Sequence, residues 1–255
     1  MDDFMYRAGS VSCSMEYLEF ETRSLRAGES VSGETGGKEA ALTILSGSCV
    51  VCTGGEARET GVRNSIFDGI SPHVTFLPAG CSFNVLAKTP LTFSIAKTAA
   101  VCNLKHVKHV EMGAIKSFTR GAEQTRREVF ELTPPGTPTN LLVYEVFTSG
   151  GNWSSFPPHK HDTETDDEKL LQEVYYFSFD PPEGFALIWL SDDDGHLDKA
   201  YSARDGDLIA IPRGYHTMCV SPGYTCSTHC VMAGPTNEWK IKVKPAYKHL
   251  LDWKR

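Results

Sequence analysis

Residues 157–177 read PPHKHDTETDDEKLLQEVYYF, and this stretch decides how the rest of the chain is interpreted. His159 and His161 are two positions apart, so both imidazoles project from one face of an extended strand. Glu173 opens the run EVYYF, which is rich in the β-branched and aromatic residues that favour strands. Tyr175 shares a strand face with Glu173 because side chains alternate with a period of two. The stretch therefore predicts two imidazoles and a carboxylate held on β-structure.

A fourth donor comes from residues 211–216, IPRGYH, where a Pro-Gly turn leads into a strand that contains His216. Two histidines on a strand are by themselves more often polar surface residues. Together with Glu173 and His216, however, they match the order of metal ligands in a cupin barrel. Three imidazoles and a carboxylate suit zinc, iron, manganese or nickel, and leave positions open for water or substrate. We predict a divalent metal, with zinc the expected ion, bound by His159, His161, Glu173 and His216.

The composition of the 255-residue chain is typical of many short strands joined by turns, with 22 Gly, 14 Pro and no long runs at helical spacing. The net charge is -7 and the lysines and arginines are scattered, which argues against a nucleic-acid or membrane surface. Residues 1–20 lack the pattern of a signal peptide, and no segment approaches the ~20 apolar residues of a membrane span. The sequence thus predicts a cytoplasmic protein whose partner is a small molecule.

A weak internal echo predicts two similar halves. The sequence LPAGCS, which ends at Ser82, can be laid beside IPRGYH, which ends at His216. Both halves have β character, but only the second has histidines at the candidate ligand positions. We expect an all-β fold of two cupin barrels (double-stranded β-helices, or jelly rolls), with a barrel without a metal site at 1–130 and a metal-binding barrel at 131–255. Because barrel edges in such folds commonly pair, we also expect a homo-oligomer.

The eight cysteines are irregularly spaced, which favours reduced thiols over a disulfide framework. Cys49 and Cys52 form a C-x-x-C, but residues three apart on a strand point to opposite faces, so shared metal binding or redox pairing is not expected. Cys219, Cys226 and Cys230 follow the last candidate ligand. They either line the barrel interior or simply pack there, as buried cysteines commonly do.

Several other polar residues have weaker signals. His106 and His109 are three apart, which places them on different faces of a strand, and we interpret them as surface histidines. Arg126 or Arg127 could reach a substrate carboxylate, because the guanidinium fork matches that group, although solvated charge in a linker is the commoner role. His229 is interpreted either as an inward-facing site residue or as a packed polar one.

The chain closely resembles the 5-deoxy-glucuronate isomerases of bacterial inositol catabolism. These are bicupin proteins related to the 4-deoxy-L-threo-5-hexosulose-uronate ketol-isomerases of pectin breakdown. The resemblance is carried by GNWSSFPPHKHD at 151–162, EVYYF at 173–177, DGD at 205–207, IPRGYH at 211–216 and VMAGP at 231–235. It implies the same four metal ligands, and it implies conversion of 5-deoxy-glucuronate, a small uronate, into 5-dehydro-2-deoxy-gluconate. The stretch RGAEQTRREV departs from the family, which usually has an Asn before an Arg there.

Such an aldose–ketose isomerisation removes a proton next to the carbonyl, forms an enediolate and returns a proton one carbon along. A divalent metal can act as Lewis acid, and a base must stand within hydrogen-bond reach of the proton. The candidates for the base are Tyr175, His229, and Glu173 after leaving the metal. An arginine within 120–127, with Arg126 the one selected, or Arg213, is the candidate anchor for the substrate carboxylate.

Two other classes use similar residues. Iron-dependent cupin dioxygenases have the same ligand set, and they are distinguished by their need for oxygen and for redox-active iron. A non-catalytic sugar-acid-binding cupin would bind a uronate without turning it over. The complete ligand set favours the isomerase over the second class.

Overall fold

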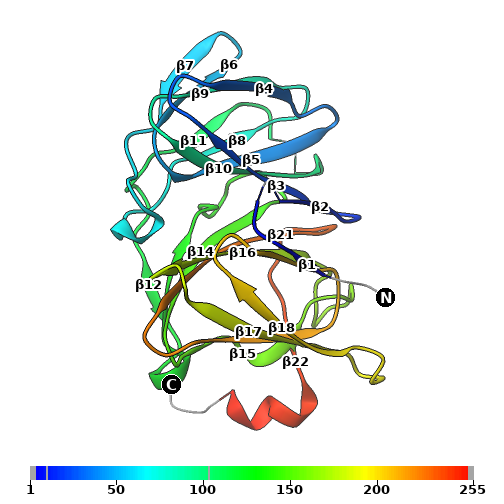
Figure 1. Ribbon diagram of the computed structural model, residues 1–255. Helices are drawn as coiled ribbons and strands as arrows, with labels where there is room; N and C mark the ends of the chain where they lie inside the picture. The colour runs from blue at the N-terminus through cyan, green and yellow to red at the C-terminus, as the bar shows by residue number, and fades with distance from the viewer. Residues whose placement is uncertain (1–3, 10, 103, 252–255) are drawn as a thin grey trace.

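The computed structural model describes residues 4–9, 11–102 and 104–251, and within them nearly all regular structure is β-strand. The helices in this part are three short 3-10 turns, η1 (Ile66–Asp68), η2 (Glu123–Thr125) and η3 (Pro245–Leu250). None of the described helices is long and apolar enough to cross a membrane. The strands form two stacked barrels, the N-terminal one above the C-terminal one in Figure 1. The prediction of an all-β fold is confirmed.

The N-terminal barrel consists of two facing sheets. One has six strands in the order β11-β8-β5-β10-β3-β2, and the other has four in the order β4-β9-β6-β7. Their bounds are β2 (Ser12–Ser14), β3 (Glu19–Leu25), β4 (Ser30–Glu34), β5 (Lys38–Ser46), β6 (Cys49–Thr53), β7 (Glu56–Glu59), β8 (Val74–Leu77), β9 (Ser82–Ala87), β10 (Leu91–Ala99) and β11 (Lys108–Val110).

The C-terminal barrel has a seven-stranded sheet in the order β1-β19-β16-β21-β14-β13-β12 and a five-stranded sheet in the order β18-β17-β20-β15-β22. Their bounds are β1 (Met5–Tyr6), β12 (Phe118–Arg120), β13 (Arg127–Glu131), β14 (Leu142–Ser149), β15 (Trp153–Lys160), β16 (Gln172–Asp180), β17 (Phe185–Ser191), β18 (Asp198–Arg204), β19 (Leu208–Ile211), β20 (Tyr215–Val220), β21 (Thr225–Ala233) and β22 (Lys242–Val243).

The two barrels repeat one topology. The order β8-β5-β10-β3 corresponds to β19-β16-β21-β14, and β4-β9-β6-β7 corresponds to β15-β20-β17-β18. The strand registers correspond as well, because Glu34 pairs with Ser82 as His159 pairs with His216. The first barrel therefore has a different set of side chains where the second has its candidate ligands: Glu34, Ala40 and Ser82 in place of His159, Glu173 and His216.

The sheets do not separate at the predicted boundary between residues 130 and 131, which falls inside β13. Strand β12 pairs with β13, and β13 pairs with β14, so both strands extend the sheet of the C-terminal barrel. At the opposite edge of that sheet, β1 pairs with β19. The second barrel thus takes edge strands from both the start and the middle of the chain.

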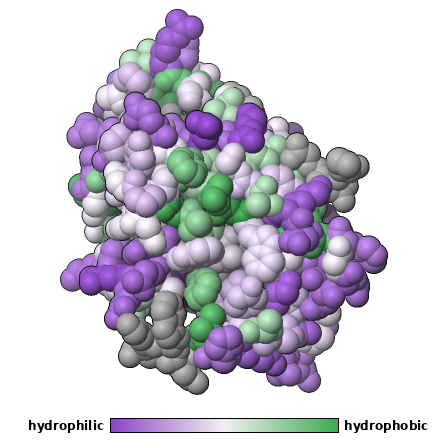
Figure 2. Space-filling model, turned by 60° about the horizontal axis from the view of Figure 1, so that its bottom comes forward, coloured by the Kyte–Doolittle hydropathy of each residue, from purple (hydrophilic) through white to green (hydrophobic). Residues whose placement is uncertain are grey.

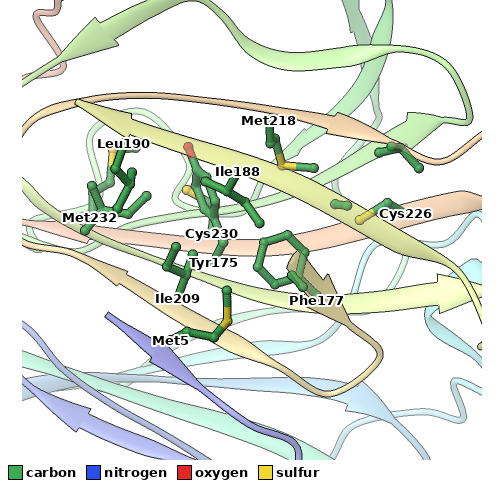
Figure 3. Packing of buried hydrophobic residues seen from close by; sticks show 14 of the residues in the cluster. Met5, Tyr175, Phe177, Ile188, Leu190, Ile209, Met218, Cys226, Cys230 and Met232 are labelled. Carbon is green, nitrogen blue, oxygen red and sulfur yellow. The ribbon is translucent and has the colours of Figure 1, made fainter. Parts of the chain in front are cut away.

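Side-chain alternation on β16 divides its residues between two hydrophobic clusters. Tyr175 and Phe177 point into the C-terminal barrel (Figure 3), and Phe179 belongs to the same cluster. Val174 and Tyr176 instead pack in a cluster to which both barrels contribute. This period-two pattern explains why residues 174–177 form an unbroken run of Val and aromatic residues, since both faces of the strand are covered there.

A buried ion pair joins the barrels. Arg63, from the loop after β7, donates from Nη1 to Oε1 of Glu145 at 3.0 Å and from Nη2 to Oε2 at 2.7 Å. Both side chains are 0% exposed. Arg63 also donates to the carbonyl oxygens of Leu45 and Ile66, at 3.2 and 3.0 Å. The guanidinium therefore links a loop of the first barrel to strand β14 of the second.

Three polar residues considered from the sequence lie away from the C-terminal barrel's interior. His229 on β21 hydrogen-bonds Ser94 Oγ at 2.8 Å, and its ring lies 5.9 Å from that of Phe20. It is thus a packed polar residue between the barrels. His106 is exposed, as expected of a surface histidine, whereas His109 is half-buried and its Nδ1 lies 3.3 Å from Nε2 of the buried His73.

Candidate active site

The four candidate ligands meet at one end of the C-terminal barrel, where β15 ends and β16 and β20 begin. Ligand atoms of His159, His161 and His216 all lie within 4.8 Å of one another. Oε2 of Glu173 lies 3.1 Å from Nε2 of both His161 and His216. Donor atoms bound to one ion at about 2.0–2.2 Å lie about 3 Å apart, so this spacing fits a shared metal.

Each histidine of the cluster has its Nδ1 directed at a backbone carbonyl, which fixes the ring. An Nδ1–H that donates to a carbonyl leaves the Nε2 lone pair free for a metal. The pairs are His159 with Pro157 at 3.0 Å, His161 with Leu171 at 2.7 Å and His216 with Gly214 at 3.2 Å. All three rings therefore leave Nε2 available to bind one shared metal ion.

The electrostatics of the cluster also fit a cation. Burial, together with the neighbouring imidazoles, lowers the pKa of His159 to about 3, so this ring is neutral. Burial would raise the pKa of Glu173, but hydrogen bonds with His161 and His216 hold it below its usual value. Burial acts against charge on His161 too, yet its contact with Glu173 raises its pKa. Metal binding would replace that proton as the partner of the carboxylate.

Asp162 ties the two ligand-bearing segments together. Its Oδ1 accepts from Lys160 Nζ at 2.8 Å, and its Oδ2 accepts from the backbone N–H of Gly214 at 2.8 Å. Glu168 in turn accepts from the backbone N–H of Asp162 at 2.8 Å. Gly214 has φ 94°, and a Cβ there would meet the carbonyl oxygen of Ser191 at 2.9 Å, so the turn before His216 requires glycine.

A bulge in β15 shapes the space beside the cluster. Ser154 pairs with Met218 whereas His159 pairs with His216, so extra residues bulge out of β15 between these pairs. Ser155 within the bulge has φ 54°, a left-handed conformation that is costly for a residue with a Cβ. Its Oγ shares a 2.7 Å hydrogen bond with the hydroxyl of Tyr175.

A cavity of about 560 Å³ opens beside the cluster and is lined by both sheets of the barrel and by the C-terminal segment. His159, Glu173 and Tyr175 lie in its wall. Much of the remaining wall is apolar, including Val129, Val146, Met232, Ile241 and Leu250. The end of the molecule formed by β22 and η3 has hydrophobic residues near its centre and hydrophilic ones around its rim (Figure 2). The cavity is thus of a size for a small molecule.

Of the arginines considered from the sequence, Arg127 lines the cavity, whereas Arg126 and Arg213 do not. Arg126 has a 65% exposed side chain and lies 3.8 Å from Glu128. Arg213 is 52% exposed and lies 3.5 Å from Asp192. The described residues that line the cavity include neither of them, but do include Arg120 and Arg127.

Cys230 and Trp239 are also part of the site. Cys230 pairs with Tyr175 in register (Figure 3), and its Sγ donates to Oε1 of Glu173 at 2.7 Å. Burial and the nearby Glu173 raise the thiol pKa well above its usual value, so the donor keeps its proton. The ring of Trp239 lies 6.5 Å from that of His159. Cys230 is one of the cysteines that the sequence left as either lining the barrel interior or packing there, and it lines the cavity, whereas Trp239 lies outside any strand and had no such signal.

The model of the KduI/IolB family matches residues 2–250 of the chain. A 5-deoxy-glucuronate isomerase of Geobacillus thermodenitrificans is 34% identical over 248 residues, which cover 95% of this chain and 89% of the relative. The protein of the same name from Bacillus subtilis strain 168 is 31% identical over 247 residues, with coverage of 93% and 89%.

The solved structures agree on the fold. An IolB-like protein from Salmonella typhimurium LT2 superimposes with a TM-score of 0.92 at 28% identity, over 98% of this chain and 99% of that one. Oxalate decarboxylase from Bacillus subtilis has a TM-score of 0.64 at 10% identity, over 95% of this chain and 80% of its own. The expected cupin fold is confirmed.

Proposed function

Because this chain belongs to the KduI/IolB family, we propose that it is a metal-dependent aldose–ketose isomerase. It would convert 5-deoxy-D-glucuronate to 5-dehydro-2-deoxy-D-gluconate in myo-inositol catabolism. The names of relatives that align over most of their length support the reaction. The observation that carries the proposal is the cluster of three imidazoles and one carboxylate in the wall of a small-molecule cavity.

The metal would be held by His159, His161, Glu173 and His216, with zinc the proposed ion and manganese, iron or nickel compatible with the same donors. When bound, a divalent metal would polarise the substrate carbonyl and stabilise the negative charge that develops as a proton leaves the neighbouring carbon. The donor set supports this assignment, since all the imidazoles direct Nε2 inward.

The chain's own residues have separable roles in this proposal. Cys230 holds Oε1 of Glu173, which leaves Oε2 directed at the imidazoles. The hydroxyls of Tyr175 and Ser155 stand at the cavity wall, where they can donate to or accept from substrate oxygens. The apolar wall limits the water around a reactive intermediate. Glu173 and Tyr175 are the proposed catalytic residues.

Tyr175→Phe tests the hydroxyl directly. We expect kcat to fall by about 10²-fold, because a positioned proton donor or acceptor contributes on that order. Metal content should remain at the wild-type level, since the ring stays in place and only Oη is lost. Turnover equal to that of the wild type would remove Tyr175 from the mechanism.

The reaction itself is tested by incubating the purified protein, after metal analysis, with 5-deoxy-D-glucuronate under anaerobic conditions. We expect NMR to show 5-dehydro-2-deoxy-D-gluconate, and we expect His161→Ala to abolish its formation. A requirement for oxygen would instead indicate dioxygenase chemistry. Binding of the uronate without any conversion would indicate a sugar-acid-binding cupin.

A further inference from the structure

Two arginines face each other across the hairpin formed by β12 and β13. Arg120 and Arg127 are direct partners in the antiparallel register, and both side chains line the cavity. Like charges directly opposite one another destabilise a sheet. The turn between them is tight: Gly121 has φ 74°, and a Cβ there would meet the carbonyl oxygen of Thr125 at 2.3 Å. The backbone thus holds two cations together at the wall of an otherwise largely apolar space.

Neither cation is neutralised by the part of the chain that the structure describes. Arg127 donates from Nη1 to the carbonyl oxygen of Thr125 at 2.8 Å, and no described carboxylate forms an ion pair with it or with Arg120. Arg63 and Arg126, by contrast, each lie beside a glutamate. Burial, together with Arg120, lowers the pKa of Arg127 to about 10, which still leaves it charged at neutral pH.

The position of the pair relative to the ligand cluster is given by Trp239. Cζ of Arg120 lies 4.9 Å from the centre of the Trp239 ring, which in turn lies 6.5 Å from the ring of His159. One indole therefore lies between the guanidinium of Arg120 and a candidate metal ligand. A ligand with an anionic group at one end and a carbonyl at the other would contact both places.

We propose that Arg127, together with Arg120, binds the carboxylate of the substrate and selects sugar acids over neutral sugars. This inference rests on the proposed function, because it concerns the same cavity. An anion between the two guanidinium groups would relieve their mutual repulsion and form charge-assisted, fork-like hydrogen bonds. It would also fix the direction of the substrate, with its carbonyl end toward Glu173 and His159.

The test compares an anionic with a neutral sugar on the metal-loaded protein. We would measure binding of D-glucuronate and of D-glucose by calorimetry for the wild type, Arg127→Met and Arg127→Lys. Arg26→Met is the matched control, because it removes one charge from a side chain that is 91% exposed. Arg127→Met should weaken D-glucuronate binding by about 10- to 100-fold, the range for a lost hydrogen bond to a charged group. Binding of D-glucose and the metal content should stay unchanged, and Arg127→Lys should lose less.

Four results would overturn the inference: equal binding of both sugars by the wild type, unchanged D-glucuronate binding in Arg127→Met, equal losses for both sugars, or a loss in the control Arg26→Met as large as that in Arg127→Met. The proposed function fails separately. If the wild type does not convert 5-deoxy-D-glucuronate but its D-glucuronate binding depends on Arg127, the carboxylate site stands and the reaction does not. If instead the wild type converts 5-deoxy-D-glucuronate and Arg127→Met has the same kcat/KM, the reaction stands and the carboxylate site does not.

Discussion

Replacing His216 with alanine is expected to weaken metal binding by more than about 100-fold. Loss of a group that merely orients a ligand costs about 10- to 100-fold in affinity, and His216 is a proposed ligand itself. The measurement is metal content after dialysis and affinity by competition with a chelator, with circular dichroism as a check on folding. Isomerase activity should fall in proportion to bound metal.

The first barrel supplies a matched control for this experiment. Ser82 is the topological counterpart of His216, because it pairs with Glu34 as His216 pairs with His159. Ser82→Ala should leave one equivalent of metal per chain. Full metal retention in His216→Ala would contradict the proposed ligand set, and two equivalents in the wild type would contradict a first barrel without a metal site.

Arg63→Met is expected to lower the free energy of unfolding by about 3–5 kcal/mol, because it leaves the buried carboxyl of Glu145 without its partner. The double variant Arg63→Met/Glu145→Leu should recover most of this loss, since a buried ion pair can often be replaced by packed apolar side chains. Denaturant unfolding of the three proteins measures both effects.

A second arginine separates the effect of losing a buried ion pair from the effect of losing an arginine charge at the surface. Arg58 is paired with Glu111 at the surface, where its side chain is 54% exposed. Arg58→Met should cost less than about 1 kcal/mol, as exposed pairs usually do. Equal losses from Arg58→Met and Arg63→Met would refute a special role for the buried pair.

The candidate ligands could be predicted because each one lies in a short sequence pattern that is recognisable without the rest of the fold. His159 and His161 need only an extended strand, Glu173 opens a run of strand formers, and His216 follows a Pro-Gly turn. What joins them is a fold whose strand order repeats in both halves. The repeated topology agrees with the echo between LPAGCS and IPRGYH, although only a few residues carried that signal.

The remainder of the site depends on registers that no local pattern determines. The choice between Arg126 and Arg127 is a shift of one residue, and on a strand one residue reverses the face. The choice between a site role and a packing role for His229 was left open for the same reason. The pairing of β21 places this residue between the barrels. The Arg63–Glu145 contact joins residues far apart in sequence, so it becomes visible only once the barrels are docked.

The edge strands of the C-terminal barrel determine what each half of the chain would contain if the two were separated. A chain divided between residues 130 and 131 would split β13 and leave Arg127 on one fragment and the proposed ligands on the other. A fragment that begins at residue 131 would therefore contain the proposed metal ligands but not the hairpin proposed to recognise the substrate's charge.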